Sequence, residues 1–185
     1  MKRTFNALAG FLFFVAFLPY IWAILQGQTQ PSPVSWAIWA TVDTLVLIAM
    51  KKERVASGQI TGAVAGAWVI TILALFYGAA TMGTIEWVSI LGAAAGIALW
   101  QWTGNAVLAI ICSCIALLVG AIPTFANAWA NPAQEDPIAW SIWLASCVFA
   151  LLAVRKWTVA DTLQPLTFTA IEATMVTLVV VKPLF

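Results

Sequence analysis

The chain alternates long apolar runs with short polar breaks. Seven apolar runs lie at 5–25, 34–50, 58–80, 85–101, 105–126, 138–154 and 162–181. A helix of about 20 apolar residues is long enough to cross a bilayer, at a rise of ~1.5 Å per residue. The pattern therefore predicts an all-α protein with seven transmembrane helices. Because the breaks are short, consecutive helices are expected to be antiparallel neighbours.

Several of the predicted helices begin at residues that favour a helix start. The pairs Ser32-Pro33 and Asp136-Pro137 each place a side-chain acceptor at the N-cap and a proline at the first helical position, where no backbone N–H is missed. Ser57 and Asp161 are expected to cap the helices at 58–80 and 162–181 in the same way.

Composition places the chain in a membrane. Hydrophobic residues make up 63% of it and charged residues 8%, whereas soluble domains carry about 25% charged residues. We expect a multi-pass protein of the cell membrane, inner or plasma, in contact with lipid and without a nucleic-acid partner. The absence of histidine excludes Ser-His-Asp and Cys-His catalysis and histidine-ligated metal sites. We therefore expect no enzyme, metal or cofactor.

The basic residues predict the orientation. With seven spans, seven of the eight lysines and arginines fall on one side of the membrane: Lys2, Arg3, Lys51, Lys52, Arg54, Arg155 and Lys156. Only Lys182 falls on the other side. Cytoplasmic loops carry the excess of Lys and Arg, so we expect a cytoplasmic N-terminus and an external C-terminus.

The two halves of the sequence match at an ungapped offset of 104 residues. The register pairs prolines, tryptophans, glutamines and basic residues, including Pro19 with Pro123, Gln30 with Gln134, Trp36 with Trp140, Trp39 with Trp143, and Lys52 with Lys156. This repeat predicts a three-helix bundle at 1–80, a linker helix at 84–102 and a second bundle at 104–185. Four crossings separate the repeats, so the bundles run parallel in a 3+1+3 layout, with the substrate cavity expected between them.

Two hairpins resemble a known family. Thr29 in a short polar loop, followed by Val34-Ser35-Trp36, is similar to the PQ-loop pattern, and Pro123-Thr124-Phe125 resembles the Pro-Thr-Phe of SWEET sugar facilitators. Vitamin-precursor transporters of the Pnu type share the layout and the tryptophan-rich composition. The resemblance implies a small-solute transporter working by alternating access; it does not identify the solute as a sugar.

Asp43 and Glu172 lie deep in predicted spans. At ~1.5 Å per residue they sit roughly 14 Å and 16 Å into their helices, near the bilayer midplane. Such residues usually face the bundle interior or a wet cavity. Because the spans lack Lys and Arg, each carboxyl must be protonated, hydrogen-bonded or neutralised by a cation. We predict that both bind substrate or protons; a structural acid bonded between helices is the alternative.

Tryptophans supply the remaining candidates for a binding site. Trp68 lies 104 residues before Glu172, so we expect it to face that carboxyl and offer a stacking surface, or else to fill core space. Trp39 and Trp143 are expected either to line an outer gate or to pack structurally. An interfacial belt is expected for Trp22, Trp36, Trp87, Trp100, Trp102, Trp129, Trp140 and Trp157.

Pro19 and Pro123 are candidate hinges, because an interior proline bends a helix and these two are duplicated; a static bend is the alternative. The sequence thus favours a facilitator or proton-coupled transporter of a small polar or cationic solute. The alternative is a non-transporting seven-helix protein that binds cargo or assembles with partners. Gly92 and Gly96 are compatible with close helix packing or with a homo-oligomer contact.

Overall fold

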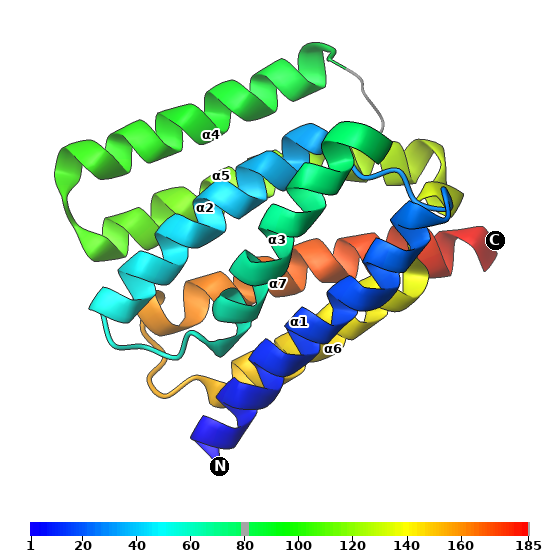
Figure 1. Cartoon of the computed structure of the whole chain (residues 1–185). Helices are drawn as coiled ribbons and strands as arrows, with labels where there is room; N and C mark the ends of the chain where they lie inside the picture. Colours follow the sequence, from blue (N-terminus) through cyan, green and yellow to red (C-terminus); the bar gives the residue numbers. More distant parts are fainter. Residues whose placement is uncertain (79–81, 185) are drawn as a thin grey trace.

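The computed structural model describes residues 1–78 and 82–184, with the backbone alone at positions 93, 96, 99 and 100. Over these residues the protein is all-helical (Figure 1). Its α-helices are α1 (Lys2–Leu25), α2 (Pro33–Lys52), α3 (Gly58–Tyr77), α4 (Thr84–Thr103), α5 (Ala106–Ala130), α6 (Pro137–Ala153) and α7 (Val159–Val176). Short helical turns, Pro132–Gln134, Thr177–Val181 and Lys182–Leu184, precede α6 and follow α7. The last residues expected in the third helix, 79 and 80, lie outside the described residues.

Several helices have the length and polarity of membrane spans. Five helical segments of the described chain qualify: α1, α2, α3, α5 and the run Val159–Leu184 that contains α7. The apolar helix α6 is shorter, at 17 residues, which is the lower end of the range for a spanning helix. These helices fit a multi-pass membrane protein.

The outer surface is apolar. Large hydrophobic side chains are exposed on the periphery of several helices, among them Phe11, Leu75, Phe76, Leu91 and Ile115, each more than half exposed. A soluble monomer rarely exposes so much contiguous apolar surface. A lipid environment removes the cost of this surface, in agreement with the composition.

Four helices form the contact between the two halves of the chain. α1 packs along α6, and α2 packs along α5 (Figure 1). Within the halves, α3 packs on both α1 and α2, and α7 packs on both α5 and α6. Helix α4 lies at the periphery, against α5 and α2 (Figure 1). The core therefore forms where α1, α2, α5 and α6 meet.

Two predicted helix caps are confirmed. The Ser32 hydroxyl accepts from the backbone N of Ser35 at 3.3 Å, and the Asp136 carboxylate accepts from the backbone N of Ala139 at 2.6 Å. Ser57 stands at the N-cap of α3 without a side-chain cap bond.

The expected capping role of Asp161 is wrong. Helix α7 begins at Val159, two residues earlier than Asp161. The buried carboxylate of Asp161 instead accepts from the backbone N of Arg155, Lys156 and Ala56, at 2.7, 2.8 and 3.4 Å. It therefore joins the α2–α3 loop to the α6–α7 loop.

Glycines allow α1 and α3 to approach closely. A Cβ built on Gly62 would lie 2.4 Å from the carbonyl oxygen of Gly10, and one on Gly10 would lie 2.5 Å from the carbonyl oxygen of Gly58. Both distances are far below a carbon–oxygen contact. The backbones of the two helices touch here, which fixes α3 against the N-terminal half of α1.

Candidate functional site

Four indoles form a cluster at the centre of the fold. Trp36 and Trp39 come from α2, Trp140 and Trp143 from α6, and each is at most 6% exposed. Ring centroids lie 5.1 Å apart for Trp36 and Trp39 and 5.0 Å apart for Trp140 and Trp143. Across the two helices, Trp36 lies 5.9 Å from Trp143 and Trp39 lies 6.3 Å from Trp140. We call these four residues the tryptophan cluster.

The interfacial positions expected for Trp36 and Trp140 are therefore wrong. Helical spacing places them one turn from Trp39 and Trp143, but the contact between the two halves covers this turn as well. Their rings pack against Tyr20, with centroids 5.4 and 6.3 Å away. Both residues belong to the core, because α1 lies over them.

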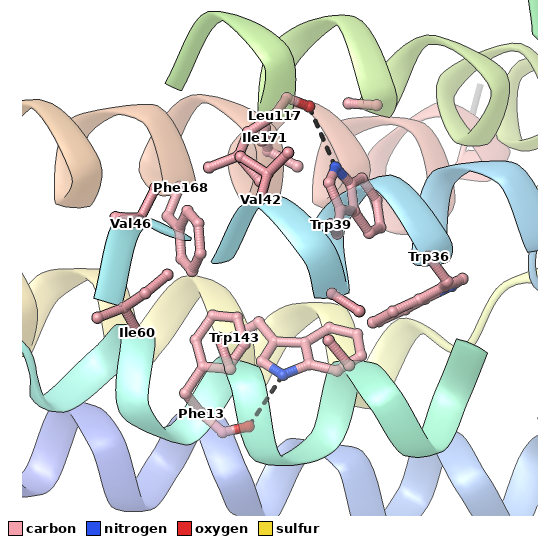
Figure 2. Close-up of a cluster of buried hydrophobic side chains, with 14 of the residues drawn as sticks. Phe13, Trp36, Trp39, Val42, Val46, Ile60, Leu117, Trp143, Phe168 and Ile171 are labelled. Atoms are coloured by element: carbon pink, nitrogen blue, oxygen red, sulfur yellow. Dashed lines mark hydrogen bonds between the residues drawn. The ribbon is translucent and has the colours of Figure 1, made fainter. Parts of the chain in front are cut away.

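Two indole N–H groups hold the cluster to the facing helices (Figure 2). Trp39 Nε1 donates to the carbonyl oxygen of Leu117 on α5 at 3.1 Å, and Trp143 Nε1 donates to that of Phe13 on α1 at 3.0 Å. Positions 13 and 117 are 104 residues apart, as are 39 and 143. The two bonds are therefore equivalent under the sequence repeat.

A small cavity lies beside the tryptophan cluster. Its walls are mostly aromatic and aliphatic, and its only charged residues are Asp43 and Glu172. The lining comprises Phe13, Phe17, Trp36, Trp39, Asp43, Ala63, Ala67, Leu117, Trp140, Trp143, Phe168, Ile171 and Glu172. The space open to the centres of water-sized molecules is about 30 Å³. That exceeds the ~10–15 Å³ needed for one water molecule, so the cavity can hold a water-sized group.

The two carboxyl groups in the cavity are buried and incompletely bonded. Asp43 on α2 is 3% exposed and Glu172 on α7 is 5% exposed. Asp43 Oδ1 and Glu172 Oε2 have no hydrogen-bond partner among the described residues. Buried polar atoms are normally bonded, so two such acceptors in one cavity indicate a site that a donor from outside can complete.

Glu135 closes one end of the core. It lies between the turn Pro132–Gln134 and α6, and it is 4% exposed. Its Oε2 accepts from Tyr20 Oη on α1 at 2.8 Å and from Trp140 Nε1 at 2.9 Å. Burial raises the pKa of Glu135 from 4.5 to about 7, against the opposing effect of these two donors. We call Tyr20, Glu135 and Trp140 the outer latch, after the orientation expected from the positions of the basic residues.

Buried amides and a hydroxyl close the opposite end. Gln59 at the start of α3 donates from Nε2 to Ser146 Oγ at 3.0 Å and to Cys147 Sγ at 3.2 Å. Gln164 on α7 donates from Nε2 to Gln59 Oε1 at 3.1 Å. Gln59 and Gln164 are each 2% exposed. We call Gln59, Ser146 and Gln164 the inner network; it links α3, α6 and α7.

Trp68 does not reach the cavity. It is 45% exposed, and its Nε1 donates to Thr44 Oγ1 at 3.2 Å. The expected position opposite Glu172 is corrected, because the side chain of Trp68 points to the outer surface beside α2. The candidate hinges, Pro19 and Pro123, lie inside α1 and α5, directly before Tyr20 and Thr124.

The remaining tryptophans are peripheral where described. Each is more than half exposed: Trp22, Trp87, Trp102, Trp129 and Trp157. The side chain of Trp100 lies outside the described residues. Lys182 stacks over the Trp129 ring at 4.2 Å and donates to the Trp129 carbonyl oxygen. Exposed indoles are compatible with the expected interfacial belt.

The described residues contain no cluster of three or more metal-ligating His, Cys, Asp or Glu side chains. No protein-family model, curated protein or solved structure matches this chain. The function is therefore inferred from the residues of this chain and their contacts.

Sequence reasoning missed Glu135, Gln59 and Gln164. Glu135 precedes a helix cap in a polar loop, which is the ordinary setting of a solvated charge. Gln59 lies in the first turn of α3 and Gln164 in the second turn of α7, near helix starts where polar residues are common. The sequence repeat is the available signal for the two amides. Gln59 and Gln164 are 105 residues apart, one residue more than the offset of 104 between the repeats.

Proposed function

We propose that this chain is a small-solute transporter that works by alternating access of two three-helix bundles around the central cavity. In this proposal the chain crosses the membrane seven times in a 3+1+3 layout. Helices α1–α3 form one bundle, α5–α7 form the other, and α4 is the linker. This is the layout expected from the resemblance to SWEET-like and Pnu-type transporters.

The packing of the helices supports the two bundles. Each main contact between two bundle helices has an equivalent contact between their counterparts in the other half. α1 packs on α6 as α5 packs on α2, and α1 packs on α3 as α5 packs on α7. The contact of α2 with α3 likewise corresponds to that of α6 with α7. A pseudo-twofold axis between parallel repeats produces this equivalence.

One residue pair supports the position of the axis. Residues near a twofold axis contact their own counterparts. Gln30 and Gln134, which the repeat pairs, do so: Gln30 N donates to the Gln134 carbonyl oxygen at 3.0 Å, and Gln134 Nε2 donates to Gln30 Oε1 at 3.4 Å. The axis proposed here passes beside this pair and through the tryptophan cluster.

The observation that carries the proposal is the pair of unpartnered acidic groups in a cavity between the halves. A carboxyl at mid-membrane depth is costly, so it is retained where it binds substrate, ion or proton. The outer latch and the inner network close the core at opposite ends. The structure therefore has the features expected of an occluded intermediate in an alternating-access cycle, in which each closure opens in turn.

The proposed hinges fit this cycle. Pro19 precedes the latch residue Tyr20, and Pro123 occupies the equivalent place in α5. An interior proline removes a helical hydrogen bond, so bending is easier there. Movement of α1 at Pro19 would separate Tyr20 from Glu135 and open the outer end.

The proposed orientation follows from charge. The α1 start and the α2–α3 and α6–α7 loops lie at one end of the molecule (Figure 1), and Asp161 joins the two loops. Together with the last turn of α2, these segments carry seven of the eight Lys and Arg residues. This end is therefore proposed to be cytoplasmic, with the C-terminus outside.

Uptake into proteoliposomes tests the proposal. Purified protein is screened by thermal shift against sugars, nucleosides, vitamins, amino acids and polyamines, since ligands of the folded state raise its apparent stability. Compounds that stabilise the protein are then supplied radiolabelled to proteoliposomes and to protein-free liposomes. We expect saturable uptake that Asp43→Asn and Glu172→Gln reduce at least tenfold. The control Glu53→Gln, which changes an exposed carboxyl, should transport normally.

Two outcomes would contradict the proposal. Ligand binding without uptake or exchange would favour the alternative, a protein that binds cargo or assembles with partners. Normal uptake in both Asp43→Asn and Glu172→Gln would show that these acids have a structural role and that the central cavity is not the transport site.

A further inference from the structure

The chemistry of the cavity narrows the class of solute. Most of its lining offers only carbon atoms and aromatic faces. Three of the four indole N–H groups are already bonded, those of Trp39, Trp140 and Trp143. Among the described residues that line the cavity, the side-chain polar atoms without a hydrogen-bond partner are Asp43 Oδ1, Glu172 Oε2 and Trp36 Nε1. The site therefore lacks the many donors and acceptors that a polyol needs, and it is rich in acceptors and π-faces.

No basic side chain neutralises the two acids from within the bundle. The sequences of α3, α5 and α6 contain no Asp, Glu, Lys or Arg, and Lys2 and Arg3 of α1 lie in its first turn. Asp43 interacts electrostatically with Glu172 and with the thiol of Cys114, and Glu172 interacts with the thiol of Cys147. Two carboxylates in one buried cavity without a cation repel each other, and a single proton held by the pair would relieve this repulsion.

We propose that the central cavity binds the head group of a protonated amine, R–NH3⁺, in exchange for one carboxyl proton. This inference rests on the proposed function, since the amine reaches the cavity when one closure opens. The ammonium N–H groups would donate to Asp43 Oδ1 and Glu172 Oε2. The aromatic walls would face the remaining positive charge, as in other cation–π sites.

Size and the number of available oxygen ligands favour this head group over a metal ion. The cavity admits water-sized groups, and an ammonium nitrogen with its hydrogens is of that size. Hard cations such as Ca²⁺ require six to eight oxygen ligands, and the lining supplies two carboxyl groups with no hydroxyl or amide oxygen. An ammonium group needs fewer acceptors and interacts favourably with indole faces.

The exchange balances charge and protons. Before binding, the pair of acids holds one proton and one negative charge. When R–NH3⁺ binds between two ionised carboxylates, the proton leaves to bulk solvent and the total charge of the filled site is again one negative. No covalent bond changes. Each amine that binds therefore releases one proton, and in a transport cycle an outward proton movement would drive amine inward.

Binding to the purified full-length protein in detergent tests the inference directly. The probe is methylammonium chloride, followed by the fluorescence of the tryptophans that line the cavity. Potassium chloride at equal ionic strength and methanol, a neutral molecule of similar size, are the comparison probes. We expect a saturable fluorescence change with methylammonium alone. Calorimetric titration in buffers of different ionisation enthalpy should give about one proton released per amine bound.

Variants connect binding to the two acids. Asp43→Asn and Glu172→Gln should each weaken methylammonium binding at least tenfold, because each removes a charge-assisted hydrogen bond. Glu53→Gln should bind normally, and the conservative Glu172→Asp should retain measurable binding. Size-exclusion profiles and melting temperatures establish that each variant is folded, so that lost binding is not lost structure.

The outcomes separate this inference from the proposed function. Lack of a saturable methylammonium response, an equal response to potassium, unchanged binding in both acid variants, or the absence of proton release would overturn the inference. Transport of a neutral solute by the same protein would leave the transporter proposal standing. Conversely, amine binding without uptake into proteoliposomes would support the amine-binding site and contradict the proposal that the chain is a transporter.

Discussion

The outer latch gives the fold a pH dependence that one substitution should remove. The carboxyl of Glu135 is buried, and its pKa is raised from 4.5 to about 7. A raised carboxyl pKa means that the folded protein binds the proton more tightly than the unfolded chain does. The resulting stabilisation is fully present below pH 4.5 and is lost as pH rises to about 7. We predict that Glu135→Gln abolishes this loss.

The magnitude follows from the pKa interval. Between 4.5 and about 7, at ~1.36 kcal/mol per pKa unit, the change in unfolding free energy is about 3 kcal/mol. For a chain of this size that corresponds to a fall in melting temperature on the order of 6–12 °C. Glutamine keeps an oxygen that can accept from Tyr20 and Trp140, so Glu135→Gln should lose little packing while losing the titration.

Melting temperatures of wild type and variant, measured in detergent from pH 4.5 to 8, provide the assay. The informative quantity is the difference between wild type and variant in the slope of melting temperature against pH, because the other groups titrate equally in both proteins. Glu53→Gln, at an exposed position, is the matched control and should follow wild type. Parallel curves for wild type and Glu135→Gln would contradict this prediction, because folding would then leave the pKa of the Glu135 carboxyl unchanged.

Two further predictions concern packing and orientation. Gly62→Ala should lower the melting temperature by several degrees, because its Cβ would overlap the Gly10 carbonyl oxygen and overpacking costs about 1–3 kcal/mol. Thr61→Ala, on the exposed side of α3, is the control. Equal melting temperatures for the two variants would rule out the backbone contact. A membrane-impermeant maleimide should label Ser57→Cys only after the cytoplasmic side is exposed, since the native cysteines are buried; labelling of intact cells from outside would reverse the proposed topology.

The helices could be predicted from the sequence, because their boundaries depend on local signals. Apolar runs and caps followed by proline predict the starts of α2 and α6 to within one residue. The sequence misplaces the start of α7, because Asp161 has the pattern of a helix cap but bonds to backbone groups of two loops. That contact is tertiary, so a local pattern could not reveal it.

The site was only partly predictable, for a physical reason of the same kind. Depth along a helix depends on residue count, so Asp43 and Glu172 could be assigned to the midplane. Which face of a helix is covered depends on the neighbouring helix. Trp36 therefore proved to be core and Trp68 peripheral, although both are tryptophans in apolar runs. Glu135 could not be predicted as buried, because it is covered by α1, which is distant in sequence.

The outer latch also bears on how such a chain could arise. At the position equivalent to Glu135 the first half has Pro31, and at the position equivalent to Tyr20 the second half has Thr124. A homodimer of the first half would present two tyrosines and no acid, and a homodimer of the second half would present two acids and no tyrosine. Neither could form the bond between Tyr20 and Glu135. Only two copies that differ at these positions, joined in one chain, combine a tyrosine from one half with an acid from the other at this end of the core.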